Sequence, residues 1–130
     1  MAIDVEKAMD KVIDHTVVEQ GTSDGWDYVK YADGRAVAEI SFNTSVAWTN
    51  NIATNLYYSG NVLNKSYPSF FIGSVNAVSN CFDTANNSWT QLSGTFVDTA
   101  NKVLKTTFIG WTNGGTHTLN VHYVVTGRWK

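Results

Sequence analysis

At 130 residues, the chain is long enough for one domain with a substantial hydrophobic core, and its formal net charge is -2. Only 15% of the residues are charged, so the composition gives no reason to expect a nucleic acid or an anionic membrane as a partner. The single cysteine, Cys81, excludes an intrachain disulfide, and no stretch approaches the ~20 apolar residues of a membrane span.

The first segment, residues 1–15, has the period of a short amphipathic helix. Apolar residues recur at spacings of three, four and three, as in a heptad seam: Ala2, Val5, Met9 and Val12. Isolated helices below ~12–15 residues are marginal in water, so the seam must pack on its own domain or on copies of itself. We expect the second, a homotrimer with an interface at Val5, Met9, Val12 and Ile13. The charges that interrupt this segment do not fit a secretory signal peptide.

Residues 16–130 are predicted to form one all-β domain. Strand-like runs separated by turn residues cover 16–20, 26–32, 35–43, 52–58, 70–78, 89–97, 103–111 and 118–126. Several short strands with no second helix among them predict an antiparallel β-sandwich that is jelly-roll-like.

The first hairpin is predicted at Asp33-Gly34, because this dipeptide between two strand-like runs is a strong hairpin signal. A two-residue turn there would place Lys30 opposite Val37 and Tyr31 opposite Ala36. The small residues of the second strand would then leave room beside Tyr31 in a tight core.

The last strand-like run alternates between an apolar and a mixed face. Leu119, Val121, Tyr123 and Val125 share the face predicted to lie in the core, while His122 lies on the other face. The mixed face is expected to meet solvent or another subunit.

Catalytic and metal-binding patterns are absent from the sequence, and we expect neither an enzyme nor a cofactor. His117 and His122 are five residues apart on one strand, so they point to opposite faces and cannot hold one metal ion together. His15 lies at the predicted end of the helix, where a cation is favourable. In a symmetric trimer, the three copies of His122 could surround an ion on the axis. The alternative is that each His122 ring is exposed or stacked.

A glycan-binding surface is the favoured interpretation of the middle of the chain. Proteins that bind neutral sugars place aromatic faces against the sugar ring and amides against its hydroxyls. Aromatic residues lie beside Asn-rich turns here, which gives these candidates: Trp48, Asn50, Asn51, Tyr57, Tyr58, Asn86, Trp89 and Trp111. Tyr57 and Tyr58 must place one ring on each face of a strand. For each tryptophan the alternative is core or intersubunit packing.

Two motifs resemble a known family. Residues 18–34 read V-E-Q-G-T-S-D-G-W-D-Y-V-K-Y-A-D-G, and the chain ends in G-R-W-K. Together these motifs are similar to the C-terminal domain of tail-fibre or minor structural proteins of phages and prophages of Gram-positive bacteria. The resemblance covers residues 17–130, with its matches at the two ends. It assigns Trp26, Tyr28 and Trp129 to the architecture, with the terminal tryptophan packed.

The resemblance implies a function as well as a fold. Domains of this family cap a fibre as a trimer, are assembled in the bacterial cytoplasm as part of the virion tail, and face the host cell surface. The implied ligand is a cell-wall polysaccharide or a teichoic acid. The sequence departs from the family pattern A-E-C-W-G in the second hairpin strand, where residues 38–42 read A-E-I-S-F.

Three other functions stay open. The domain could be a structural cap that trimerises a fibre without touching a receptor, or a monomeric carbohydrate-binding module. A glycan-cleaving enzyme would require a carboxylate whose loss abolishes turnover.

Overall fold

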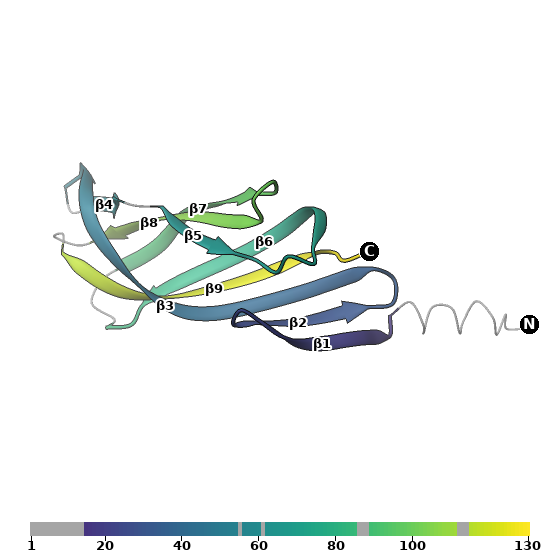
Figure 1. Cartoon of the computed structure of the whole chain (residues 1–130). Coiled ribbons are helices and arrows are strands. Elements are labelled where there is room, and N and C mark those ends of the chain that lie inside the picture. The colour runs from purple at the N-terminus through teal and green to yellow at the C-terminus, as the bar shows by residue number, and fades with distance from the viewer. Residues whose placement is uncertain (1–14, 55, 61, 86–88, 112–114) are drawn as a thin grey trace, which may run out of the picture.

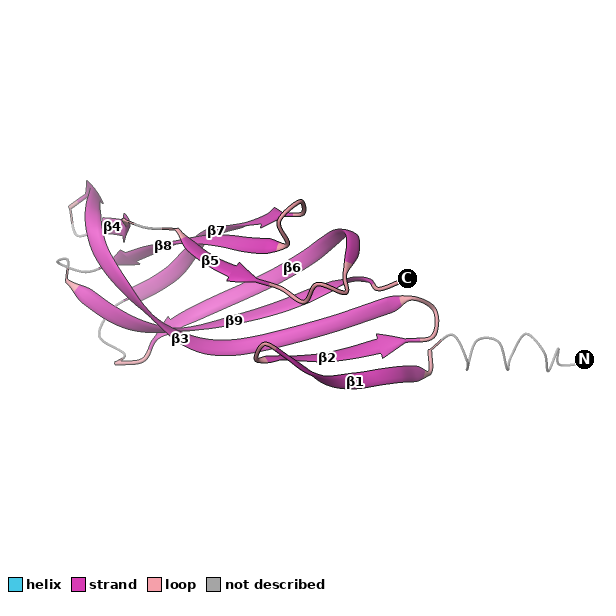
Figure 2. Ribbon diagram, viewed as in Figure 1, coloured by secondary structure: helices cyan, strands magenta, loops and turns pink. Residues whose placement is uncertain are grey.

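The computed structural model describes residues 15–54, 56–60, 62–85, 89–111 and 115–130. All regular elements in these ranges are β-strands: β1 (Val17–Ser23), β2 (Trp26–Tyr31), β3 (Arg35–Ala53), β4 (Leu56–Ser59), β5 (Leu63–Ser66), β6 (Ile72–Asp83), β7 (Trp89–Asp98), β8 (Val103–Trp111) and β9 (Thr116–Arg128). The predicted all-β antiparallel class is therefore confirmed (Figure 2). The predicted helix, with Val5, Met9, Val12 and Ile13, lies outside the described residues; only His15 at its end is described, in a turn.

The strands form two layers that β3 joins (Figure 1). The lower layer has the order β1-β2-β3-β9-β6, because β2 and β9 pair with opposite edges of β3 and β6 pairs with the free edge of β9. In the upper layer, β7 lies along one edge of β8, and β4 and β5 follow one another along its other edge. The first part of β3 pairs with β9, and its last residues pair with β4 in the upper layer.

The core lies between the two layers and follows the alternation of the strands. Leu119, Val121, Tyr123 and Val125 of β9 are all 0% exposed, which confirms the predicted inward face. They pack with the buried small residues of β3 and with Leu104 and Phe108 of β8 from the opposite layer. Burial of each large apolar side chain contributes ~1.5–3 kcal/mol to folding.

A chain of hydroxyl groups crosses this apolar interior. Ser79 Oγ lies 2.9 Å from Thr95 Oγ1, which lies 3.0 Å from Thr106 Oγ1. Thr106 Oγ1 lies 2.6 Å from the hydroxyl of Tyr123, and both of these residues are 0% exposed. The chain connects β6, β7, β8 and β9, and it satisfies polar groups that would otherwise be costly to bury. Burial raises the pKa of the Tyr123 hydroxyl.

The β2–β3 hairpin corrects the predicted register by one residue. Val29 pairs with Val37 and Lys30 with Ala36, so the loop has three residues rather than two. Gly34 has a φ of 94° and its amide donates to the carbonyl of Tyr31, whereas Asp33 keeps a negative φ. A two-residue type I′ turn needs positive φ at both positions, and this turn has it at the glycine alone. The shift exchanges the faces, so Trp26 and Tyr28 pack on the core beside Ala36 and Ala38.

Several strand boundaries also differ from the prediction, and β1 and β6 extend to Ser23 and Asp83. The run 52–58 was expected to be one strand, but β3 continues to Ala53 and the chain then turns back into β4 at Leu56. The short strand β5 was not predicted, because L-N-K-S lacks the β-branched and aromatic residues that mark strands. The last residues of β3 are held by pairing with β4, and β5 is held by pairing with β8, rather than by local propensity.

The two sequence motifs meet in one cluster around the ammonium of Lys30. Nζ lies 2.8 Å from Glu19 Oε2 and 4.6, 5.3 and 5.6 Å from the ring centres of Phe70, Trp129 and Tyr28. The Tyr28 hydroxyl donates to Glu19, and hydrogen bonds from Lys30 and Tyr28 lower the pKa of that carboxyl. The cluster joins β1 and β2 to the end of the chain.

The terminal tryptophan is held by further hydrogen bonds. Its indole Nε1 donates to the carbonyl of Tyr31 at 2.8 Å, and its backbone amide donates to Gly34 at 2.9 Å. Arg128 reaches the carbonyl of Asp33 at 2.8 Å. The expectation of a packed Trp129 is thus confirmed. Trp26, which the resemblance assigned to the architecture, is 1% exposed, and its indole donates to the carbonyl of Ser66.

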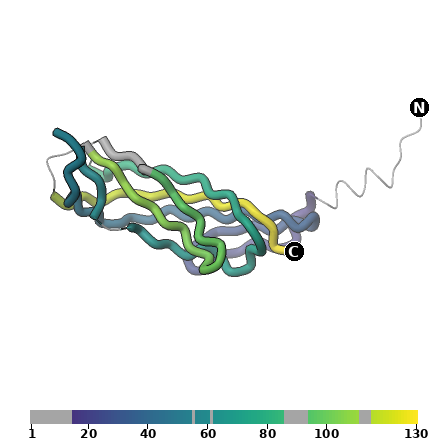
Figure 3. Tube along the Cα trace, turned by 90° about the horizontal axis from the view of Figure 1, so that it is seen from above, coloured from purple at the N-terminus to yellow at the C-terminus, as the bar shows by residue number. Residues whose placement is uncertain are grey.

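The molecule has two distinct ends (Figure 3). At the terminal end, β3 begins, β9 finishes and β7 turns into β8. His15 lies at the same end, where its Nδ1 is 2.7 Å from Nη2 of Arg35. At the opposite, far end, Ala53 pairs with Leu56, Ala47 with Thr116 and Trp89 with Trp111. With a rise of ~3.3 Å per residue, β3 runs about 60 Å along its path between the ends.

Candidate functional site

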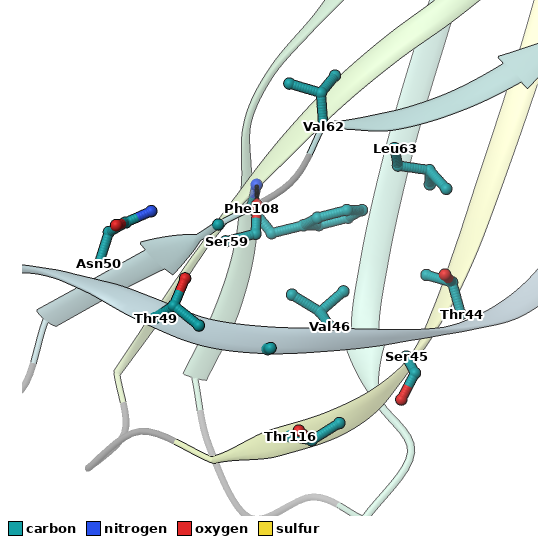
Figure 4. Close-up of a pocket in the computed structure, with 12 residues that line it drawn as sticks. Thr44, Ser45, Val46, Thr49, Asn50, Ser59, Val62, Leu63, Phe108 and Thr116 are labelled. Carbon is teal, nitrogen blue, oxygen red and sulfur yellow. Dashed lines mark hydrogen bonds between the residues drawn. The ribbon is translucent and has the colours of Figure 1, made fainter.

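A groove of about 600 Å³ lies in the far half of the molecule, between β3 and the segment from β4 to β5 (Figure 4). The second half of β3 forms its floor, and β8 and the start of β9 complete it. β3 reaches this position because it is long enough to leave the lower layer and pair with β4 above it.

The groove has an apolar wall and a polar margin. Its apolar lining consists of Val46, Val62, Leu63 and Phe108, and Figure 4 shows the Phe108 ring between Val62 and Leu63 on one side and Val46 on the other. Phe108 and Val46 are 1% and 6% exposed, so Val62 and Leu63 are the apolar side chains that a ligand can reach. Its polar groups are neutral hydroxyls and one amide: Thr44, Ser45, Thr49, Asn50, Ser59 and Thr116.

Ser59 is fixed by the fold. Its Oγ accepts a hydrogen bond from the amide of Phe108 at 3.1 Å, and the residue is 5% exposed. The hydroxyl can still donate its own hydrogen. Beside it, the Thr49 hydroxyl lies so close to Gly60 that a Cβ there would collide with it. The absence of a side chain at this glycine therefore keeps the margin of the groove open.

None of the residues that line the groove is ionisable at neutral pH. The groove therefore offers hydrogen bonds and apolar contact but no general acid, base or ion pair. Elsewhere in the far half, Asp83 Oδ2 and His117 Nδ1 lie 2.7 Å apart. The Asp83 side chain is 1% exposed and its other oxygen accepts the amide of Ala85, so this pair anchors the turn after β6.

The structure brings one predicted ligand residue, Asn50, into the groove. Trp48 is elsewhere: it is 3% exposed, its indole lies against Gly110, and it has no open face for a ligand. The residue belongs to the core, which was the alternative interpretation of each tryptophan. Asn51 is exposed beside the groove and is not part of its lining.

Tyr57 and Tyr58 occupy opposite faces of β4, as expected. Tyr57 packs against the core, whereas Tyr58 is 41% exposed and pairs with Asn50 across the β3–β4 ladder. Tyr58 is therefore the aromatic candidate closest in register to the groove. Asn86 and the side chains of Trp89 and Trp111 lie outside the described residues.

Sequence reasoning missed most of the groove. Thr44, Thr49, Ser59, Val62 and Leu63 come from three segments that only the β3–β4 and β5–β8 pairings bring together. The one local signal was Ser59-Gly60, which marked a turn.

Within the described ranges, no group of three or more histidine, cysteine or acidic residues is placed to hold a metal ion. The same part of the chain contains no helix long and apolar enough to cross a membrane. No family model, curated protein or solved structure matches this chain.

Proposed function

We propose that this domain is the receptor-binding tip of a phage tail fibre, and that its groove binds a glycan on the surface of a Gram-positive bacterium. The observation that carries the proposal is an uncharged groove of hydroxyl, amide and apolar groups in the half of the molecule away from both described chain ends. The motifs at residues 18–34 and 127–130 supply the phage context.

The chemistry of the groove supports a sugar ligand. A sugar presents hydroxyls at its edges and C–H groups on its faces, so it needs neutral hydrogen-bonding groups beside an apolar wall. Thr49 and Asn50 supply the first, and Val62 and Leu63 supply the second. Tyr58 lies where a further ring of the same glycan could stack.

The placement of the chain ends supports a tip. The described N-terminal end and the C-terminus both lie at the terminal end, near Arg35 and Gly34. A shaft that enters there leaves the groove pointing away from the particle. In this proposal three copies assemble through residues 1–14 in the virion, and the domain acts at the host cell surface.

Adsorption of the labelled protein to a panel of Gram-positive cells tests the groove. We expect Thr49→Val and Asn50→Ala each to weaken adsorption by about tenfold, the effect of one lost hydrogen bond of ~1.4 kcal/mol. Asn80→Ala, on the exposed outer side of β6, is the matched control and should adsorb like the wild type. Urea unfolding of each variant verifies that the fold is retained. Equal adsorption of all three variants would rule out the groove as the receptor-binding site.

A structural cap is the second candidate, favoured by the burial of Trp48 and Trp26 in the core. If the domain is a structural cap, the wild type should adsorb to no cell in the panel. Trp48→Ala should then change the stability of the fold and have no effect on adsorption.

A further inference from the structure

Most of the cationic residues that the structure describes lie toward the terminal end of the molecule. No lysine or arginine occurs in residues 36–64, 66–101 or 106–127. Those that the structure describes are Lys30, Arg35, Lys65, Lys102, Lys105, Arg128 and Lys130. Lys65 pairs with Leu104 and Asn64 with Lys105, which places both lysines within three residues of the start of β8. Lys65 comes nearest to the groove, because it follows Leu63 of the lining by two residues, but it is not itself part of the lining.

Most of these cations are already engaged. Lys30 pairs with Glu19, Arg35 with Asp33 at 2.6 Å, and Lys105 with Asp98 at 3.5 Å. Lys102 donates to the carbonyl of Ser69, Arg128 donates to that of Asp33, and Lys65 lies 4.9 Å from the ring centre of Phe42. A hydrogen bond from the Arg35 backbone amide, and a further one from its guanidinium, lower the pKa of the Asp33 carboxyl.

The far half offers few charged partners to an anion. Its carboxylate Asp83 is buried, and the His117 ring beside it would have any positive charge matched by that carboxylate. The groove is lined by neutral residues throughout. A phosphate placed among these residues would lose part of its hydration and gain no charged partner from the lining, which is costly.

We infer that the receptor bound at the groove is an uncharged polysaccharide and not a phosphate-bearing polymer such as a teichoic acid. This inference rests on the proposed function and names the class of its ligand. Binding of a polyanion needs clustered lysine or arginine, and it weakens steeply as salt displaces the polymer from them. Binding of a neutral sugar through hydroxyls, an amide and an apolar wall depends little on salt.

The test uses polymers released from the wall of a bacterium that the protein adsorbs to. Anion-exchange chromatography separates them into a neutral fraction and a retained, phosphate-bearing fraction, and each competes with cells for the labelled full-length chain. We expect the neutral fraction alone to compete, and adsorption to change less than twofold between 50 and 500 mM NaCl. Competition by the phosphate-bearing fraction, with a tenfold or greater loss of adsorption over this range, would overturn the inference.

The groove variants separate this result from a failure of the proposed function. If the phosphate-bearing fraction competes and Asn50→Ala still weakens adsorption, the groove binds a receptor of the other class. If Asn50→Ala and Thr49→Val adsorb like the wild type, the groove is not the receptor site, and both proposals fail.

Discussion

At the scale of single residues, the buried hydroxyl chain explains how a polar group can lie in the centre of this core. Thr106 and Tyr123 are both 0% exposed, yet each hydroxyl has a partner. Trp48 contrasts with them, because its buried Nε1 has no hydrogen-bond partner among the described atoms. The tight fit of its ring against Gly110 holds it there in spite of that cost.

We predict that Tyr123→Phe lowers the free energy of unfolding by about 1–2 kcal/mol, because it removes one of the two hydrogen-bond partners of the buried Thr106 without changing the packing of the ring. Urea denaturation at neutral pH measures the difference. Tyr58→Phe is the control, since this hydroxyl belongs to an exposed residue, and it should change stability by less than ~0.5 kcal/mol. A loss as small as in the control would show that the hydroxyl chain contributes nothing to stability.

The residues of the groove were only partly predictable. Asn50 was found because an amide next to an aromatic residue in a turn-rich segment suggests sugar binding. Trp48 was ranked with it for the same reason, but whether its ring points inward depends on the register of β3 with β4, which is irregular between Trp48 and Asn50. Thr44 and Ser59 carry no local signal, because only the pairing of distant strands makes them neighbours.

At the scale of elements, alternation was the reliable guide and turn geometry was not. The inward face of β9 followed directly from its apolar residues. The Asp33-Gly34 hairpin was located correctly, yet the turn has one residue more than predicted, and a shift of one residue exchanges the two faces of a strand. Sequence signals thus placed the hairpin without fixing which rings enter the core.

The C-terminal anchor provides a test of how the elements are held together. We expect Trp129→Ala to lower the free energy of unfolding by about 2–3 kcal/mol, because it removes ring contacts and an indole hydrogen bond to Tyr31. Thermal and urea unfolding would show the effect. Lys130→Ala, at the exposed neighbouring position, should stay within ~0.5 kcal/mol of the wild type. If the two variants were equally stable, the terminal tryptophan would not be part of the fold's support.

At the scale of the whole molecule, the proposed trimer makes a direct prediction about mass. Light scattering after size-exclusion chromatography should give about three times the chain mass of 14.3 kDa. Deletion of residues 1–14 should shift the particle toward a monomer, because the heptad seam is its expected interface. A monomeric full-length chain would contradict the trimer and favour a carbohydrate-binding module.

The position of the Lys30 cluster has a mechanical consequence. If the shaft pulls at His15 while a receptor holds the far half, tension enters β1 and must cross to β2 and then to β3. Hydrogen bonds between these strands lie perpendicular to the pull, so they are loaded in shear and must break together. The β2–β3 link has only four residue pairs, against thirteen between β3 and β9. Lys30 of β2 pairs with Glu19 of β1 and contacts the ring of Trp129, which follows β9 on the other side of β3. These contacts would therefore act as a clamp across β1, β2 and β3 when an attached particle is under load.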